Sequence, residues 1–212
     1  MTLPDFHLYL ITDRKQTGGR DLLWVLEQAL EGGVKAVQLR EKDLTGKELF
    51  SLAEKTLRLC QNYGAHLFIN DRVDVCLAIN ADGVQIGTSS LPVDAARQLL
   101  GPLKLIGAST HSLEEAREAQ RRGADFVLFG PVFHTAAKAS YGPPQGLTAL
   151  KAVVEKLSRP VYAIGGIQPD NVEETRRTGI RGVALISAVI SASDPKGATA
   201  KILKFFQRLG HE

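Results

Sequence analysis

The stretch VYAIGGIQPDN, residues 161–171, gives the first indication of the fold. Four residues suited to a buried strand run directly into two glycines, and Pro-Asp-Asn then provides a plausible start for a helix. Glycine is favoured where φ is positive or where another group approaches the backbone closely. A strand-to-helix turn explains the pair, and so do exposed N–H groups that bind an anion such as phosphate. The rest of the sequence has to separate these two interpretations.

The same order of strand and helix recurs along the chain. Apolar runs suited to buried strands occupy residues 7–12, 36–39, 66–70, 83–86, 104–109, 125–130, 161–165 and 182–187. Amphipathic segments separate them; residues 22–30, for example, place four leucines on one helical face, and Gly32-Gly33 ends that helix. Near-continuous apolar strands that alternate with helices predict a parallel sheet. Eight such strands favour an α/β fold of the (β/α)8 TIM-barrel type over a doubly wound open sheet.

Length and composition predict one domain over residues 1–212, because no linker or low-complexity run interrupts the pattern. The 26 basic and 23 acidic residues nearly balance, so we expect no nucleic-acid partner. The longest apolar stretch, GVALISAVI, is far shorter than the roughly twenty residues that cross a membrane, and the first residues do not resemble a signal peptide. Cys60 and Cys76 lack metal-binding spacing and are expected to be reduced thiols, which favours a cytoplasmic protein.

Polar residues follow the predicted strands at the ends where a barrel places its active site. They are Thr12, Asp13 and Arg14; Gln38, Arg40, Glu41 and Lys42; Asn70, Asp71 and Arg72; Thr88, Ser89 and Ser90; Ser109, Thr110 and His111; His134, Thr135 and Lys138; Gly165 and Gly166; and Ser187. Cations, hydroxyl groups and glycine amides therefore converge on one rim. This predicts an anionic substrate, with phosphate bound after the seventh and eighth strands.

Several of these residues also have ordinary structural explanations. Arg40 and Lys42 alternate and could face the same side, but a surface salt bridge to Glu41 or Asp43 would explain them too. Asp71 could cap the following helix or ligate a hard cation such as Mg²⁺.

The two histidines near the rim differ in context. His111 stands beside Ser112, which with Glu115 forms a capping-box pattern, so it favours a helix start. His134 lies in a loop rich in glycine and proline and is a candidate acid or base.

Several separated blocks of the chain resemble the thiamine phosphate synthase family, which also contains thiazole tautomerases. These blocks are QLREK at 38–42, FINDRVDVCLAINADGVQIG at 68–87, GAST and HS at 107–112, FGPVF at 129–133, AIGGI at 163–167 and ALISAVI at 184–190. The resemblance extends from Tyr9 to about Lys204. It implies a barrel enzyme that joins hydroxymethylpyrimidine pyrophosphate to thiazole phosphate, releasing pyrophosphate and forming thiamine phosphate.

Carried over residue by residue, the resemblance implies a role for each rim position. The pyrophosphate would be held, and its departure assisted, by Arg40, Lys42, Asn70, Ser109 and Lys138. Asp71 would ligate Mg²⁺, Gln38 would contact the pyrimidine, and Thr135 would contact the thiazole. The thiazole phosphate would lie on the Gly165-Gly166 turn and the backbone of Ile186 and Ser187.

Two positions depart from the synthase pattern. After the fourth strand the family typically has a second acidic Mg²⁺ ligand, whereas this chain has Ser90, and a hydroxyl is a weaker ligand for a hard cation. Ala137 replaces the second Thr of a TxTK motif. Both departures imply weaker metal or thiazole binding.

Two alternatives to the synthase therefore stay open. In thiazole tautomerases an active-site histidine follows the sixth strand, in FGHVF; here Pro131 occupies that position, so His134 would have to act as the acid or base. A non-catalytic protein that binds thiazole phosphate would keep Gly165 and Gly166 but would not need the pyrophosphate residues. The sequence predicts no particular oligomeric state.

Overall fold

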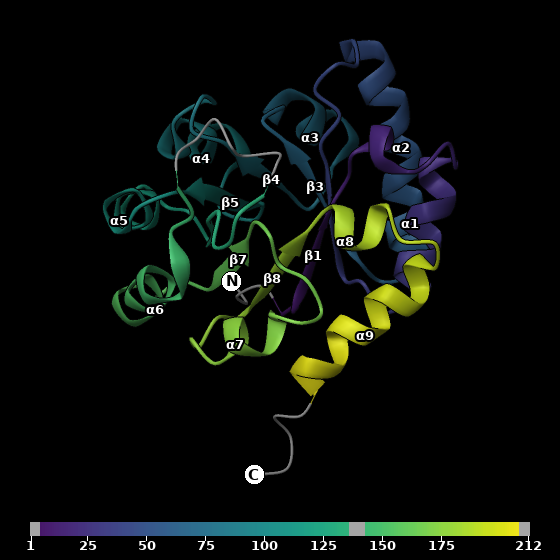
Figure 1. Ribbon diagram of the computed structural model, residues 1–212. Coiled ribbons are helices and arrows are strands. Elements are labelled where there is room, and N and C mark those ends of the chain that lie inside the picture. Colours follow the sequence, from purple (N-terminus) through teal and green to yellow (C-terminus); the bar gives the residue numbers. More distant parts are fainter. Residues whose placement is uncertain (1–4, 136–142, 208–212) are drawn as a thin grey trace.

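The computed structural model describes residues 5–135 and 143–207, and eight parallel strands close into a barrel in chain order. The strands are β1 Leu8–Ile11, β2 Ala36–Leu39, β3 His66–Asn70, β4 Gly83–Ile86, β5 Leu105–Thr110, β6 Phe126–Phe129, β7 Val161–Ile164 and β8 Gly182–Leu185. β8 pairs with β1, for example Tyr9 with Ala184, and so closes the barrel. The expected (β/α)8 TIM barrel is confirmed (Figure 1).

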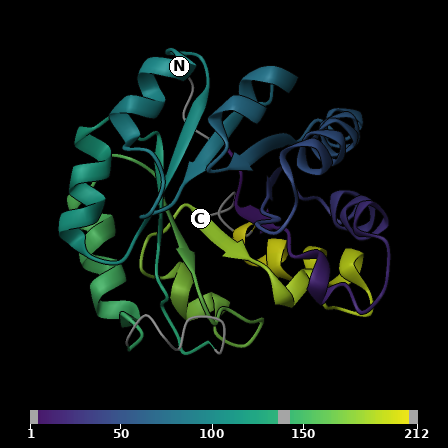
Figure 2. The same cartoon turned by 90° about the horizontal axis from the view of Figure 1, so that it is seen from above.

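Helices surround the strands on the outside of the barrel, as the view from above shows (Figure 2). They are α1 Leu22–Glu31, α2 Gly46–Asn62, α3 Val73–Ile79, α4 Val93–Leu100, α5 Leu113–Arg121, α6 Gly146–Lys156, α7 Val172–Arg176, α8 Ser187–Ile190 and α9 Pro195–Gln207, with a short 3-10 helix, η1, at Arg14–Gln16. Among the described residues, no helix is long and apolar enough to cross a membrane.

Local sequence explains several helix ends. Thr45 and Glu48 form a reciprocal capping box at the start of α2, and the Ser112 hydroxyl accepts the Glu115 N–H at the start of α5. The eighth predicted strand was two residues too long: the backbone turns at Ile186, and the residue after it already begins α8. A short extra helix after the last strand is a common feature of phosphate sites in this fold.

Aromatic side chains fill the barrel near the amino ends of its strands. Phe6, Tyr9, Phe68, Phe126 and Tyr162 are all at most 2% exposed. Their rings pack face to face or edge to face, with the Phe6 and Tyr162 centroids 4.9 Å apart, and the Tyr162 hydroxyl donates to the Phe6 carbonyl at 2.9 Å. This packing fills the interior of the barrel near the amino ends with apolar rings.

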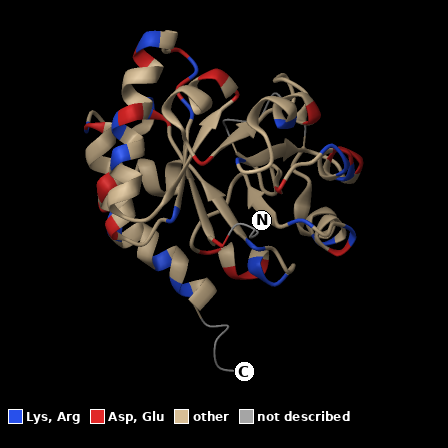
Figure 3. Ribbon diagram, turned by 180° about the vertical axis from the view of Figure 1, so that it is seen from behind, with Lys and Arg blue, Asp and Glu red and all other residues tan. Residues whose placement is uncertain are grey.

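Ion pairs and charge-assisted hydrogen bonds join the loops at the amino ends of the strands. Asp125 accepts from Arg97 at 2.5 Å and from the Ile106 N–H at 2.8 Å. Arg97 also donates to three backbone carbonyls in the neighbouring turns. On the outer helices, residues of both charges are interspersed (Figure 3). The acidic groups at this end are therefore matched by nearby donors.

Candidate active site

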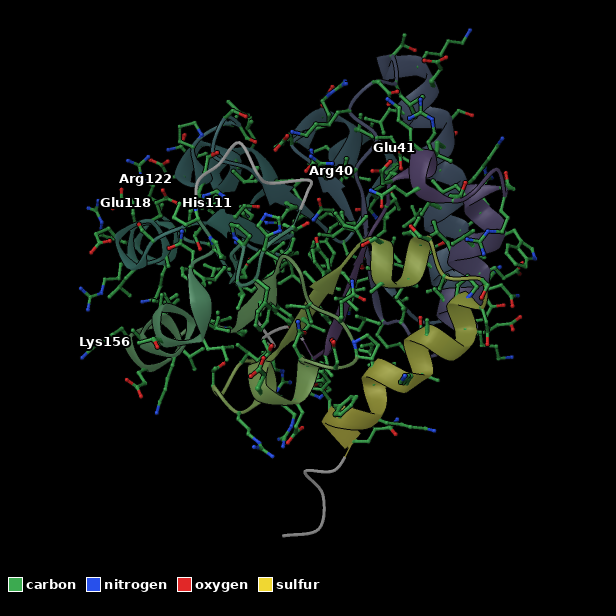
Figure 4. All side chains as sticks on the ribbon, in the orientation of Figure 1. Arg40, Glu41, His111, Glu118, Arg122 and Lys156 are labelled. Carbon is green, nitrogen blue, oxygen red and sulfur yellow. The ribbon has the colours of Figure 1, made fainter. Side chains whose placement is uncertain are left out.

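The residues after β2, from Arg40 to Lys42, contact different neighbours. The Arg40 N–H donates to the Thr12 hydroxyl at 2.9 Å, which ties the end of β2 to the end of β1. The buried Glu41 carboxylate instead accepts from the Arg14 N–H, at 3.1 and 3.2 Å, and from its guanidinium at 3.0 Å. Lys42 follows in the turn after β2 and is exposed. Figure 4 labels Arg40 and Glu41 at this end of the barrel.

The acidic neighbours of Arg40 and Lys42 are occupied by other cations. Asp43 pairs with Arg14 at 2.6 Å and with Lys15 at 2.9 Å. Hydrogen bonds from these two side chains hold the pKa of Asp43 well below its usual value. In the part of the chain that the structure describes, neither Arg40 nor Lys42 forms an ion pair. The salt-bridge explanation of these two residues is therefore wrong, and their charges remain available at the rim.

Asp71 connects the ends of β3 and β4. It has a φ of +60°, and its carboxylate accepts from Asn70 Nδ2 at 2.8 Å and from the Gly87 N–H at 3.1 Å. The Ser90 hydroxyl also donates to this carboxylate and accepts a second contact from the Gly87 N–H. The structure therefore brings together Asp71 and Ser90, the two residues at the expected Mg²⁺ ligand positions.

The helix-cap explanation of Asp71 is wrong. The N-cap residue of α3 is Arg72, and no side chain there accepts a hydrogen bond from the first turn. The Asp71 side chain turns instead toward the loop after β4.

The donors around Asp71 suit a magnesium ion that the substrate helps to hold. The described residues contain no group of three or more His, Cys, Asp or Glu side chains that could hold a metal ion. One carboxylate and one hydroxyl meet at the rim, and Mg²⁺ often uses one or two carboxylates together with substrate phosphates and water. The residues present fit such an ion, but not a metal site made by the protein alone.

β4 contributes a buried polar residue, Gln85, that the sequence analysis missed. Gln85 Nε2 donates to Ser109 Oγ at 3.1 Å, and the Gln85 side chain is almost completely buried. The available signal was the period of two along each strand, which places Gln85 on the inward face with Gly83. The neighbouring Thr110 donates to the Leu128 carbonyl at 3.2 Å and has a structural role.

Gln38 and Tyr9 lie on the inward face of β2 and β1. Gln38 is 2% exposed and Tyr9 is completely buried. Burial raises the pKa of the Tyr9 phenol, and the nearby Gln38 amide offsets only part of this effect. Since the Tyr9 oxygen has no well-formed hydrogen bond among the described residues, the interior below the rim is polar but incompletely paired.

The Gly165-Gly166 turn is required first by the protein's own backbone. The two glycines have φ values of +97° and +68°. A Cβ on Gly165 would lie 2.6 Å from Pro131 Cα, and one on Gly166 would lie 2.6 Å from the His134 carbonyl oxygen. The turn interpretation is therefore confirmed, because the loop after β6 packs directly on these residues.

The same turn keeps its backbone donors available. In residues 5–135 and 143–207, neither Gly165 nor Gly166 donates its N–H to a protein acceptor. β7 and β8 are neighbours, so Ile186 and Ser187, at the start of α8, lie on the same part of the rim. These N–H groups are therefore available to bind an anion, as the second interpretation of the turn requires.

The remaining predicted residues are placed less fully. Thr135 is half-buried, and His134 is exposed with its carbonyl against Gly166. His111 donates its N–H to Glu115 at 2.7 Å, which confirms that it marks a helix start. Lys138 and Ala137 lie outside the described residues.

Residues 8–189 match the sequence model of a family described as thiamine monophosphate synthase. The chain belongs to this family. A Clostridium novyi thiamine-phosphate synthase is 42% identical over 195 residues, which cover 92% of this chain and 96% of that protein. A relative from Geobacter sulfurreducens, provisionally named a thiamine-phosphate synthase, is 51% identical over 96% of this chain and 95% of that protein.

A solved structure agrees with this membership of the thiamine monophosphate synthase family. Thiamine phosphate pyrophosphorylase from Pyrococcus furiosus superposes with a TM-score of 0.89 at 41% identity, covering 97% of this chain and 98% of that one. The family resemblance predicted from the sequence blocks is confirmed, and so is the barrel that it implied.

Proposed function

We propose that this chain joins hydroxymethylpyrimidine pyrophosphate to thiazole phosphate at the carboxyl rim of the barrel, releasing pyrophosphate and forming thiamine phosphate. Thiamine-phosphate synthesis is the activity named for its relatives, and it makes the protein a transferase. The observation that supports this reaction best is the pair Arg40 and Lys42. Both lack acidic partners among the described residues, while Arg14 and Lys15 occupy the neighbouring carboxylates.

The residues proposed to hold the pyrophosphate can stabilise it as it leaves. Its departure leaves a positive charge on a benzylic-type carbon, which the electron-rich pyrimidine stabilises. The protein then has to neutralise the leaving group and align the thiazole nitrogen, without a general base. The Arg40 guanidinium can bind two oxygens at once, Lys42 adds a point charge, and Asn70 and Ser109 add neutral donors at the next strands.

The two ring systems are proposed to lie on opposite parts of the rim. The buried Gln38 amide, at the end of β2, would contact the pyrimidine. Thr135 would contact the thiazole. The thiazole phosphate would accept from the N–H groups of Gly165 and Gly166, which have no acceptor among the described residues, and from the backbone at Ile186-Ser187. We also assign Lys138 to the pyrophosphate.

Mg²⁺ is the cofactor of this proposal. Asp71 would ligate the ion, with Ser90 beside it at the place of a second ligand. When bound, Mg²⁺ supplies further neutralisation of the pyrophosphate charge. Asn70 and the Gly87 N–H hold the Asp71 carboxylate in position for this role.

We further propose that residues 1–212 act as one cytoplasmic domain on small phosphorylated substrates, without a nucleic-acid or membrane partner. The two cysteines support the reducing compartment. Cys60 and Cys76 are free and buried, and burial raises the pKa of their thiols to about 12 and about 11. Thiols in this state are chemically inert and are suited to the core.

Synthesis of thiamine phosphate from the two substrates tests the function directly. The protein should be purified from a host without its own synthase, and product measured by chromatography with and without Mg²⁺. We expect product that depends on Mg²⁺. If no product forms but thiazole phosphate still binds, the synthase proposal is contradicted and a binding protein is favoured. If the wild type isomerises the thiazole carboxylate phosphate and His134→Ala does not, the protein is a tautomerase instead.

A further inference from the structure

The hydrogen bond between Gln85 and Ser109 joins two neighbouring strands just below the rim. Gln85 Nε2 lies 3.1 Å from Ser109 Oγ. Gln85 is 1% exposed in β4, whereas Ser109 is half-buried near the end of β5. The bond therefore links a fixed interior side chain to a hydroxyl at the barrel mouth.

The surroundings of Gln85 determine which end of its amide faces Ser109. Gln85 Oε1 is buried and has no hydrogen-bond partner among the residues that the structure describes. It lies over Gly107, where the Phe126 ring also packs, since a Cβ on Gly107 would collide with both groups. A buried carbonyl oxygen that lacks a partner is tolerated better than a buried N–H group that lacks one.

The reversed amide would be less favourable. It would place the N–H groups of Gln85 over Gly107, where the described residues offer no acceptor, and unpaired buried N–H groups are rarer than under-satisfied carbonyls. The observed orientation therefore makes Gln85 the donor and Ser109 the acceptor. Gly107 is part of this arrangement, because its missing side chain leaves the space in which the amide lies.

The direction of this bond determines what Ser109 can do next. A serine hydroxyl has one hydrogen and two acceptor lone pairs. Because Gln85 fills a lone pair, the Ser109 hydrogen stays free to donate to another group. An anionic oxygen at the rim is the acceptor that gains most from such a donor.

We propose that Gln85 is a positioning residue, whose amide N–H holds Ser109 as a hydrogen-bond donor toward the pyrophosphate. This inference rests on the proposed function, since it is that function which places pyrophosphate at Ser109. Gln85 acts through Ser109 and needs no contact with the substrate.

Four substitutions test the proposal. Gln85→Leu removes the donor at similar volume, and Gln85→Glu replaces it with an acceptor that would capture the Ser109 hydrogen. Gln85→His restores an N–H at similar reach, and Ser109→Ala removes the hydroxyl. Each variant, and the double variant with Gln85→Leu and Ser109→Ala, is titrated with inorganic pyrophosphate and Mg²⁺ by calorimetry. Steady-state kinetics and thermal melting accompany the titrations.

We expect Gln85→Leu and Ser109→Ala each to weaken pyrophosphate binding by about tenfold, with the double variant no weaker than Ser109→Ala. Gln85→Glu should be at least as weak as Ser109→Ala, and Gln85→His should recover most of the affinity. KM for thiazole phosphate should stay unchanged. The melting curves show whether each variant is folded, and the histidine variant keeps the test decisive if the leucine variant does not fold.

Other results would overturn the inference. Losses that multiply in the double variant would show that the two residues act independently. Wild-type affinity in Gln85→Glu, or no pyrophosphate binding by the wild type, would remove the proposed role. A wild type that binds pyrophosphate but forms no thiamine phosphate would contradict the synthase proposal, while the titrations would still decide the role of Gln85.

Discussion

The two ends of the barrel differ in whether their charged side chains are paired. At the amino ends of the strands, the Asp125 carboxylate is paired with Arg97 and with a backbone N–H. At the carboxyl ends, Arg40 and Lys42 have no acidic partner among the described residues, and Asp71 is held by neutral donors. The difference separates stability from function: removing one partner of a mostly buried pair leaves an uncompensated charge, whereas an unpaired charge at the rim can bind a ligand.

The rim also contains the charges that keep Arg40 and Lys42 unpaired. Arg14 occupies both Glu41 and Asp43, which are the acidic residues beside them in sequence. Arg14, which has no role in the proposed chemistry, therefore leaves the charges of Arg40 and Lys42 without an acidic partner among the residues that the structure describes. The following predictions test whether the two ends really differ in this way.

The largest expected effect is on activity at the carboxyl end. Arg40→Gln should lower kcat/KM by about 10²- to 10³-fold, because a charge-assisted contact to the pyrophosphate is lost. Its melting temperature should stay close to that of the wild type, since the guanidinium forms no ion pair with a described residue. Arg117→Gln, on the exposed face of α5, is the matched control. Equal activity in the two variants would contradict the assignment.

The next largest effect is on stability at the amino end. Asp125→Asn should lower the free energy of unfolding by about 2–4 kcal/mol, because Arg97 loses its counter-charge in a mostly buried site. Activity per folded molecule should be unchanged. Urea denaturation measures the loss, and Asp94→Asn, in an exposed pair with Arg122, should cost less than about 1 kcal/mol. Similar losses in both variants would show that the Asp125 pair adds no special stability.

The barrel could be predicted from sequence because its evidence is local. The strands at 36–39, 66–70 and 83–86 have the predicted bounds, since apolar runs and flanking turn residues mark both ends. The family resemblance also placed Asp71 and Ser90 at one site, and the structure brings them into contact.

The pairing of polar groups could not be predicted in the same way. Glu41 reaches Arg14 across 27 positions, and Gln85 reaches Ser109 across 24. Such contacts depend on the register of neighbouring strands and on the space left by Gly107, which no single segment encodes. The salt-bridge hypothesis for Arg40 failed for this reason, because the nearest acidic residue in sequence faces another loop.

A smaller effect is expected when a second acidic group is added at the carboxyl end. Ser90→Asp would place a second carboxylate beside Asp71, where like charges repel unless a cation lies between them. We expect a lower melting temperature without Mg²⁺ that is recovered on adding Mg²⁺, and half-maximal activity at several-fold lower Mg²⁺ concentration. Ser89→Asp in the same loop is the control. Identical Mg²⁺ titrations for Ser90→Asp and wild type would show that Ser90 does not occupy a ligand position.

The smallest expected effect concerns the pH dependence of the His66–Asp82 pair at the amino end. A hydrogen bond to Asp82, at 3.1 Å, raises the pKa of His66. Burial raises the pKa of Asp82, but bonds from His66 and the Leu67 N–H outweigh this and leave it lowered. His66 therefore adds stability below its unfolded pKa, near 6.5, and loses it as pH rises through the folded pKa. Asp82 adds stability above its unfolded pKa and loses it as pH falls.

Both contributions of this pair are therefore present in mildly acidic solution. His66→Gln should reduce the free energy of unfolding by less than about 1 kcal/mol, because the imidazole is half exposed to water. The difference from wild type should be largest near pH 5.5 and shrink toward pH 9. Urea denaturation at both pH values measures it, and other titrating groups cancel in the difference. A difference that is constant with pH would mean that the imidazole contributes packing alone, and that charge pairing at the amino end is confined to more buried groups such as Asp125.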